Sequence, residues 1–138
     1  MHLAKSFGAD AILIILSCTN SSLAKDLYQA ANELNITTIV ETHTPDEAEK
    51  ALIFKDAIIG INNRNLSTLK TDINTTLQLY KILLNHSSPI ISESGFKSDK
   101  EVKEIVKQTG ILTFLIGESL LKNIGKTSLL KKIVQISH

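Results

Sequence analysis

Polar residues gather at four places in the sequence, each directly after a short apolar run. The residues are Glu41; Asn62 and Arg64; Glu93, Ser94 and Gly95; and Gly117 and Glu118. Carboxylates, amides and glycine turns of this kind supply the side chains and backbone N–H groups of many active sites. Any single one of them more often caps a helix or faces water. Their recurrence after four runs favours a functional site.

The last two clusters carry the clearest physical signal, because each apolar run leads into a glycine, Gly95 or Gly117. Backbone N–H groups at such turns attract an anion such as phosphate, as does the N-terminus of the short helix expected at 118–121. A tight turn alone would explain one glycine. Two glycines at successive strand ends favour a site for a phosphorylated small molecule.

The elements that must position these residues are strands that alternate with helices. The β-branched runs are 11–16, 37–40, 57–61, 89–92 and 113–116. Their apolar character is continuous rather than alternating, which predicts parallel strands buried on both faces. The carboxyl ends of parallel strands meet at one edge of a sheet, so the four polar clusters are expected on one face of the molecule.

Helix signals separate the runs. Thr44, Pro45 and Glu47 predict a capping-box start. A later helix is expected to begin with Ser98 and Glu101 as its cap and to end at Gly110. Further helices are predicted from the apolar repeats at Leu23, Leu27, Ala31 and Leu34, at Ile73, Leu77, Tyr80 and Leu84, and from Asn123 onward.

Alternating strands and helices predict an α/β fold, either a doubly wound open sheet or a closed barrel. A complete (β/α)8 barrel needs about 250 residues, whereas this chain has 138. Residues 1–7, closed by Gly8, resemble the end of a helix whose beginning is missing. We therefore expect 1–138 to form a single domain, a partial TIM barrel of five parallel strands, with the N-terminal three strands absent.

Composition limits the class of partner. The net charge of +1 is spread along the chain, which argues against nucleic acid and membrane surfaces as partners. The single cysteine, Cys18, forms no internal disulfide, no metal-ligand spacing is present, and no apolar run could span a bilayer. We expect a cytoplasmic protein. His43 is expected to face solvent or to support its turn, with proton transfer beside Glu41 as the less favoured alternative.

Five segments together resemble the later half of indole-3-glycerol-phosphate synthases. They are GADAILIILS, TIVETHTPDEAEKAL, DAIIGINNRNLSTLKTDINTT, PIISESGFKS and TFLIGESLLKN. The order INNRNL, then SESG about thirty residues later, then LIGESL is specific, because other phosphate barrels share only the last two elements. Two other barrel enzymes, phosphoribosylanthranilate isomerase and tryptophan synthase alpha, are alternatives that INNRNL disfavours.

The resemblance implies a carboxy-lyase that needs no cofactor. This family closes the indole ring of 1-(2-carboxyphenylamino)-1-deoxyribulose 5-phosphate with loss of carbon dioxide and water, which requires an acid and a base. By motif position, Glu41 would be the base, Asn62 would orient the substrate or the acid–base pair, and Ser94, the third catalytic residue, would contact the substrate hydroxyls. Substrate-binding roles would fall to Arg64, Glu93, Gly95, Gly117 and Glu118, the last three through backbone contacts to phosphate.

The resemblance also implies that part of the active site is missing. The family's two essential lysines and another carboxylate belong to strands that would precede Met1. Losing a positioned acid typically costs about 10²- to 10⁴-fold in rate, so the isolated chain is expected to be nearly inactive. We expect it to self-associate or to need an N-terminal half-barrel chain. The remaining alternative is an inactive remnant that only binds phosphorylated ligands.

Overall fold

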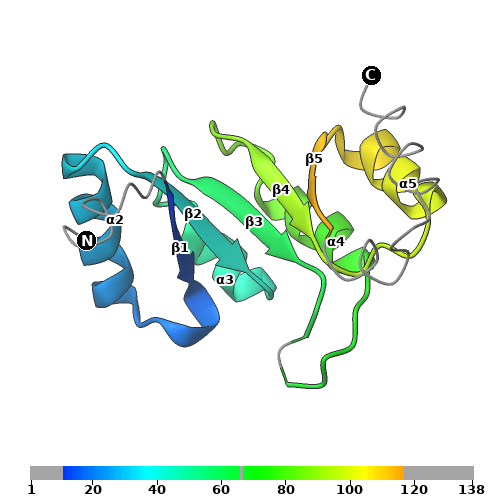
Figure 1. Cartoon of the computed structure of the whole chain (residues 1–138), viewed down its shortest axis with the longest axis horizontal. Coiled ribbons are helices and arrows are strands. Elements are labelled where there is room, and N and C mark those ends of the chain that lie inside the picture. Colours follow the sequence, from blue (N-terminus) through cyan, green and yellow to red (C-terminus); the bar gives the residue numbers. More distant parts are fainter. Residues whose placement is uncertain (1–10, 66, 117–138) are drawn as a thin grey trace, which may run out of the picture.

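The computed structural model of the chain describes residues 11–65 and 67–116. Strands and helices alternate throughout this part (Figure 1). The elements are β1 (Ala11–Ile15), a 3-10 turn η1 (Leu16–Cys18), α2 (Ser21–Glu33), β2 (Thr37–Thr42), α3 (Pro45–Ala51), β3 (Ile58–Asn62), α4 (Asn74–Ile82), β4 (Ile90–Glu93), α5 (Asp99–Thr109) and β5 (Thr113–Leu115). The helices expected in 1–7 and from Asn123 lie outside the described residues.

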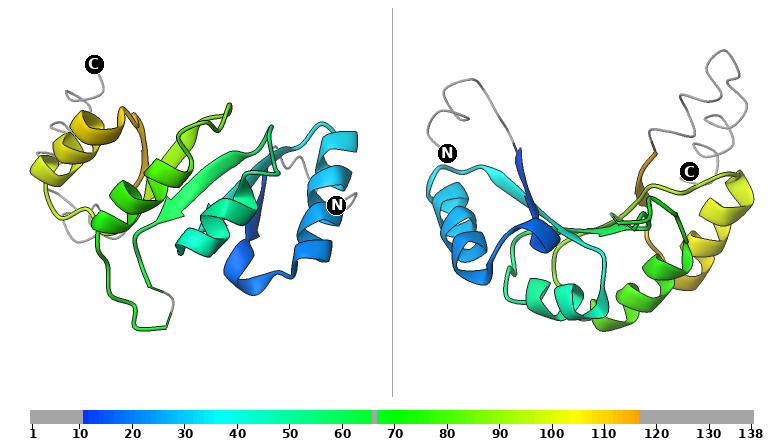
Figure 2. Two further views of the ribbon diagram at one scale, coloured as in Figure 1. Left: turned by 180° about the vertical axis from the view of Figure 1, so that it is seen from behind. Right: turned by 90° about the horizontal axis from the view of Figure 1, so that it is seen from below.

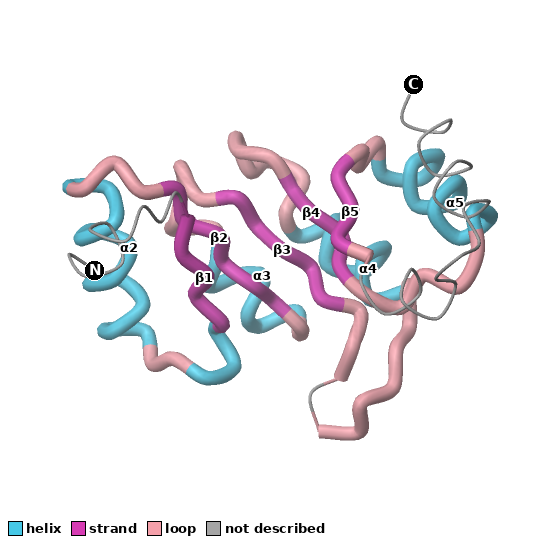
Figure 3. Tube along the Cα trace, in the orientation of Figure 1, coloured by secondary structure: helices cyan, strands magenta, loops and turns pink. Residues whose placement is uncertain are grey.

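The five strands form one sheet in the order β1-β2-β3-β4-β5, and every neighbouring pair is parallel. Figure 2 shows the sheet as a curved wall, with the helices on its convex side and its concave side open. The same succession of strand and helix is visible along the tube in Figure 3. This confirms the expected α/β architecture, because right-handed β-α-β crossovers place successive helices on one side of a barrel wall.

The main core lies between the sheet and the helices. Ile14, Val40, Ile59 and Ile61 point to the convex side and are buried with Leu79 of α4. A second cluster around Phe96 holds α5 in place. Side chains alternate between the two faces of a strand, so the intervening residues face the concave side. Leu13 and Leu115 on that side remain 52% and 62% exposed.

The strand boundaries differ from the sequence-based expectation at the carboxyl ends of the strands. Glu41 lies within β2, and Asn62 and Glu93 are the last residues of β3 and β4 rather than the first residues beyond them. The parallel ladder continues through them, with Glu41 opposite Gly60 and Asn62 opposite Glu93. Within a strand, the position of a residue fixes the face of the sheet to which its side chain points; in a loop no such rule applies.

The predicted helix caps have mixed outcomes. The capping box of α3 is confirmed, because Thr44 Oγ1 accepts a hydrogen bond from Glu47 N at 3.2 Å. Gly110 ends α5 in the left-handed conformation at φ 76°, as expected. Ser98 is the N-cap residue of α5, as predicted, but its side chain makes no cap hydrogen bond. Instead, Glu101 accepts from the backbone N–H of Lys97 at 2.6 Å.

Candidate functional site

Three of the predicted site residues meet on the concave face of the sheet. Glu41 comes from β2, Asn62 from β3 and Glu93 from β4. The strand register places Gly60 directly beside Glu41, and Asn62 directly beside Glu93. Gly60 and Asn62 are two residues apart on β3 and therefore share a face. The structure thus brings the two carboxylates to opposite sides of one strand, with Gly60 between them.

Gly60 is the residue that lets the two carboxylates meet. A Cβ atom added at Gly60 would collide with Oε1 of Glu93. Because glycine has no side chain, the Glu93 carboxyl reaches across β3 and forms a hydrogen bond with Glu41. Sequence analysis overlooked Gly60. The available signal was a glycine inside a β-branched run, which often marks a close approach by another group.

The electrostatics of the pair favour a shared proton. Glu41 is 6% exposed and Glu93 is 4% exposed. Burial, followed by the hydrogen bond and the charge of Glu41, raises the pKa of Glu93 from 4.5 to about 8. Two neighbouring buried carboxylates avoid being charged together, so one of them retains a proton near neutral pH. An acid and a base therefore lie side by side on this face.

Asn62 and Arg64 sit where the chain turns away from the sheet. Asn62 Oδ1 accepts a hydrogen bond from Arg64 N at 2.9 Å, which tightens this turn. Both residues line a cavity of about 590 Å³ beyond the carboxyl ends of β1, β2 and β3. Glu41 and Glu93 are not among the lining residues, so the carboxylate pair lies beside this cavity rather than in it.

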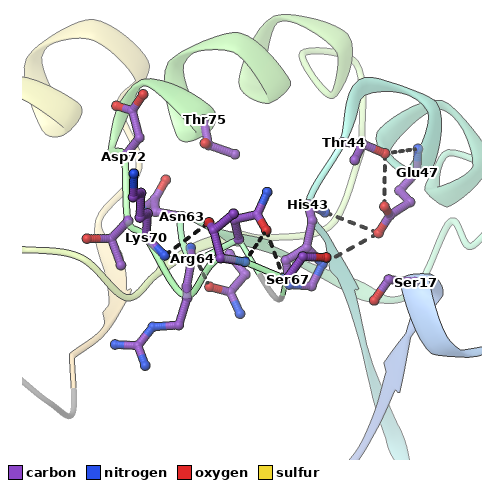
Figure 4. A pocket seen from close by; sticks show the side chains of 14 residues that line it. Ser17, His43, Thr44, Glu47, Asn63, Arg64, Ser67, Lys70, Asp72 and Thr75 are labelled. Carbon is purple, nitrogen blue, oxygen red and sulfur yellow. Dashed lines mark hydrogen bonds and ion pairs between the residues drawn. The ribbon is translucent and has the colours of Figure 1, made fainter.

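The walls of the cavity come from two segments that are distant in sequence. Figure 4 shows His43, Thr44 and Glu47 on one side, with Lys70 and Asp72 of the loop after β3 on the other. Arg64 and Lys70 supply positive charge, whereas Glu47 and Asp72 supply negative charge. The cavity is therefore polar and of mixed charge.

Ser94 and Gly95 form a tight turn after β4. Both have left-handed backbone angles, at φ 68° and 80°. A left-handed non-glycine residue such as Ser94 is strained, and such strain often occurs at functional sites. A Cβ at Gly95 would also lie 2.8 Å from Cβ of Thr71. The expected turn at Gly95 is confirmed, while Gly117 and Glu118 lie outside the described residues.

A second polar cluster, which sequence analysis missed, lies behind the site on the helix-covered face. Asn63 is 2% exposed. Its Nδ2 donates to Ser92 Oγ at 3.2 Å and to the Ser94 carbonyl at 3.1 Å. Its Oδ1 accepts from Thr76 N at 3.1 Å and from Thr76 Oγ1 at 2.8 Å. Asn63 therefore ties the ends of β3 and β4 to the start of α4.

Support of the turn, one of the two settings expected for His43, agrees with the hydrogen bond from its backbone N–H to Glu47 Oε1 at 3.3 Å, but His43 does not face solvent. Its side chain is 9% exposed and lies between the carboxylates of Glu41 and Glu47. Successive side chains of β2 point to opposite faces of the sheet. Thr42, after Glu41, points to the helix-covered face, and its hydroxyl donates a hydrogen bond to the Gly60 carbonyl at 3.0 Å. His43 consequently returns to the side of Glu41.

Two further properties concern only the described part of the chain. No group of three or more histidine, cysteine, aspartate or glutamate residues there could hold a metal ion. None of its helices combines the length and the apolarity needed to cross a bilayer. Cys18 is exposed, with its Sγ 3.7 Å from Ser17 Oγ.

Comparison with known sequences identifies one family. The family model for indole-3-glycerol phosphate synthase matches residues 1–133. Proteins of that name from Legionella pneumophila strain Paris and Magnetococcus marinus are 44% identical over 121 residues and 40% identical over 119 residues. Each match covers 86% of this chain, but only 46% and 44% of the relative. The chain therefore spans somewhat less than half the length of the relatives it matches.

Comparison with solved structures supports the fold. A tryptophan synthase structure from M. tuberculosis superposes with a TM-score of 0.62 at 12% identity, covering 97% of this chain and 50% of that chain. A tryptophan synthase structure from Pyrococcus furiosus gives 0.65 at 15% identity, covering 97% and 55%. At these identities the likeness concerns the fold alone. It agrees with a partial (β/α)8 barrel.

Proposed function

The chain belongs to the indole-3-glycerol phosphate synthase family, and from this premise we propose that its concave face forms the later half of that enzyme's active site. The proposed reaction is the cytoplasmic carboxy-lyase step of tryptophan biosynthesis that closes the indole ring. The observation that carries the proposal is the Glu41–Glu93 pair across Gly60. Ring closure needs a proton donor and a proton acceptor held near one another.

The proposed roles of the pair follow from its protonation. Glu41 acts as the base that removes a proton from the substrate. Glu93, whose pKa of about 8 keeps it largely protonated at neutral pH, contacts a substrate hydroxyl and can donate a hydrogen bond to it. Asn62, which lies beside Glu93 on the concave face, orients the substrate. Ser94 is the third residue with a proposed catalytic role, after Glu41 and Asn62. Different environments for two carboxyl groups are a common way to separate acid and base roles.

The substrate's charged groups are proposed to extend to either side of this pair. Arg64, two residues beyond the end of β3, would lie beside the carboxylate of the substrate. Backbone N–H groups of Gly95, Gly117 and Glu118 would hold its phosphate. The turn at Ser94–Gly95 supports this role, because Ser94 N donates to the Leu115 carbonyl at 3.0 Å and so fixes the turn against β5.

Activity is proposed to require further β/α units that cover the concave face. The exposed Leu13 and Leu115 lie on β1 and β5, the two edge strands of the described sheet. Parallel strands are normally buried on both faces. Additional units, supplied by an N-terminal half-barrel or by self-association, would bury these side chains, and an N-terminal half-barrel would also supply the remaining acid groups.

The test is indole-3-glycerol phosphate formation, followed by product fluorescence, for the whole chain alone and mixed with the N-terminal half of the Legionella relative. We expect activity in the mixture and a loss of about 10²- to 10⁴-fold with Glu41→Gln, since a positioned base contributes that much. Glu49→Gln, which removes a carboxylate from the exposed side of α3, is the matched control. A folded, associated mixture without activity would contradict the proposal, as would full activity of Glu41→Gln.

A further inference from the structure

His43 lies between two carboxylates that belong to different elements. Its Nε2 is 3.7 Å from Glu41 Oε2, and its Nδ1 is 3.5 Å from Glu47 Oε1. Glu41 belongs to β2, and Glu47 belongs to the first turn of α3. The three side chains are 9%, 8% and 13% exposed. The imidazole is therefore enclosed, with one carboxylate at each nitrogen.

The two ring nitrogens have no closer partner within the described residues. Both are buried and neither makes an ordinary hydrogen bond. Burying such groups without compensation costs free energy. The carboxylates of Glu41 and Glu47 need only a small movement to accept hydrogen bonds from the ring; a neutral imidazole can donate to one of them, and an imidazolium to both. Each ring nitrogen therefore has one carboxylate as its nearby polar group.

Glu47 is firmly anchored and can serve as the fixed end of this arrangement. Its carboxylate accepts from Thr44 Oγ1 at 2.9 Å and from the backbone N–H of His43 at 3.3 Å. Its own N–H donates to Thr44 Oγ1. A negative charge in the first turn of a helix is also favoured by the helix dipole. The capping box of α3 therefore fixes one carboxylate beside His43 Nδ1.

We propose that His43 is a positioning residue that links the carboxylate of Glu41 to the anchored carboxylate of Glu47 and so fixes the orientation of Glu41. This inference rests on the proposed role of Glu41 as the base. A base oriented by a third group is a recurrent arrangement in catalysis, and small displacements of a reacting group reduce rate strongly. Other charged side chains that line the same cavity as His43 are Arg64, Lys70 and Asp72, all from the segment after β3.

The first test detects the linkage without activity. In ring-nitrogen NMR spectra of the whole chain, Glu41→Gln should shift the Nε2 resonance of His43, and Glu47→Gln should shift its Nδ1 resonance. Gln can still cap α3, so the fold is kept. His86, whose Nε2 bonds the Ala57 carbonyl at 2.8 Å, is an internal reference, and Glu49→Gln is the charge-matched control. His43 resonances unaffected by both substitutions would overturn the proposal.

The second test measures the consequence for the reaction in the reconstituted mixture. His43→Asn can mimic only Nδ1 and should lower kcat about 10- to 100-fold with little change in KM, because Glu41 loses its support. His43→Gln can reach toward Glu41 and should retain more activity. Glu47→Gln should lower kcat similarly, and adding it to His43→Asn should cost little more, since the two residues act as one unit.

The outcomes separate this inference from the proposed function. Wild-type kcat for His43→Asn, or fully multiplicative effects of His43→Asn and Glu47→Gln, would overturn the positioning role while leaving Glu41 as the base. A wild-type mixture without activity would contradict the proposed function. In that case the NMR shifts would still decide whether His43 joins the two carboxylates.

Discussion

The buried polar groups on the two faces of the sheet differ in kind: ionisable carboxyl groups lie on one face and neutral, hydrogen-bonded groups on the other. On the concave face, the buried carboxyl groups of Glu41 and Glu93 approach each other across Gly60, and burial beside Glu41 raises the pKa of Glu93. On the helix-covered face, Asn63, Thr76 and Ser92 are neutral and hydrogen-bonded to one another. Both clusters include a residue near the end of β4, since Glu93 belongs to the first and Ser92 to the second.

The difference shows how one strand end serves two purposes. A closed network of neutral hydrogen bonds stabilises a fold, because each buried donor and acceptor has a partner. A pair of buried carboxylates raises a pKa and keeps a proton available, at a cost in stability. Two adjacent residues thus differ in their surroundings. Asn62 lies beside Glu93 on the concave face, and Asn63 belongs to the hydrogen-bond network on the helix-covered face.

The largest expected difference in stability between the two faces comes from truncating these two asparagines. Asn63→Ala removes the four hydrogen bonds that its side chain makes to Thr76, Ser92 and Ser94, and it should destabilise the chain by about 3 kcal/mol. Asn62→Ala should cost less than about 1 kcal/mol, because it loses one local hydrogen bond. Denaturant unfolding of both variants measures this contrast. Equal losses would show that the two faces are equally structural.

The next effect concerns the pH dependence of stability. The pKa of Glu93 is higher in the folded chain, about 8, than its ordinary value of 4.5. As pH rises, the unfolded chain releases this proton before the folded chain does. The stability that Glu93 contributes below about pH 4.5 is therefore lost progressively between about pH 4.5 and pH 8. Glu93→Gln should remove this loss, which we expect to be about 2 kcal/mol, less than the full pKa shift would give, because the effective dielectric constant around buried groups is well above that of a dry interior.

Thermal melts of the wild type and Glu93→Gln at several pH values between 5 and 8 test this expectation. The difference between the two curves isolates the contribution of Glu93 from that of all other titrating groups. Parallel curves would mean that the pair holds no shared proton.

The third and smallest contrast with the wild type is expected from Gly60→Ala. The added methyl group would occupy the position of the Glu93 carboxyl oxygen, which is the end of a flexible side chain and can move aside. Stability should therefore change by only about 1 kcal/mol, but Glu93 should no longer reach Glu41. The observable consequence is a weaker pH dependence in the same melts, close to that of Glu93→Gln. An unchanged pH profile would show that Gly60 does not control the pair.

Much of this arrangement was accessible from the sequence. The continuous apolar runs predicted five parallel strands, and polar residues at their ends predicted one functional edge with Glu41, Asn62 and Glu93. The face of the sheet to which each of these side chains points could not be predicted, because it depends on whether the strand pairing continues through that residue. For the same reason Asn63 was missed: it differs from Asn62 only in the side of the sheet to which it turns.

Local residue patterns by themselves determined the alternation of strands and helices, the capping box at Thr44 and the edge at which the polar groups gather, since these depend on neighbours within a few residues. Tertiary structure alone decided which charges meet. Glu41 and Glu93 are joined only because β3 lies between their strands with a glycine at the crossing point. His43 lies between Glu41 and Glu47 only because α3 turns back beside the end of β2. Distances of this kind depend on strand register and helix packing, which no short stretch of sequence specifies.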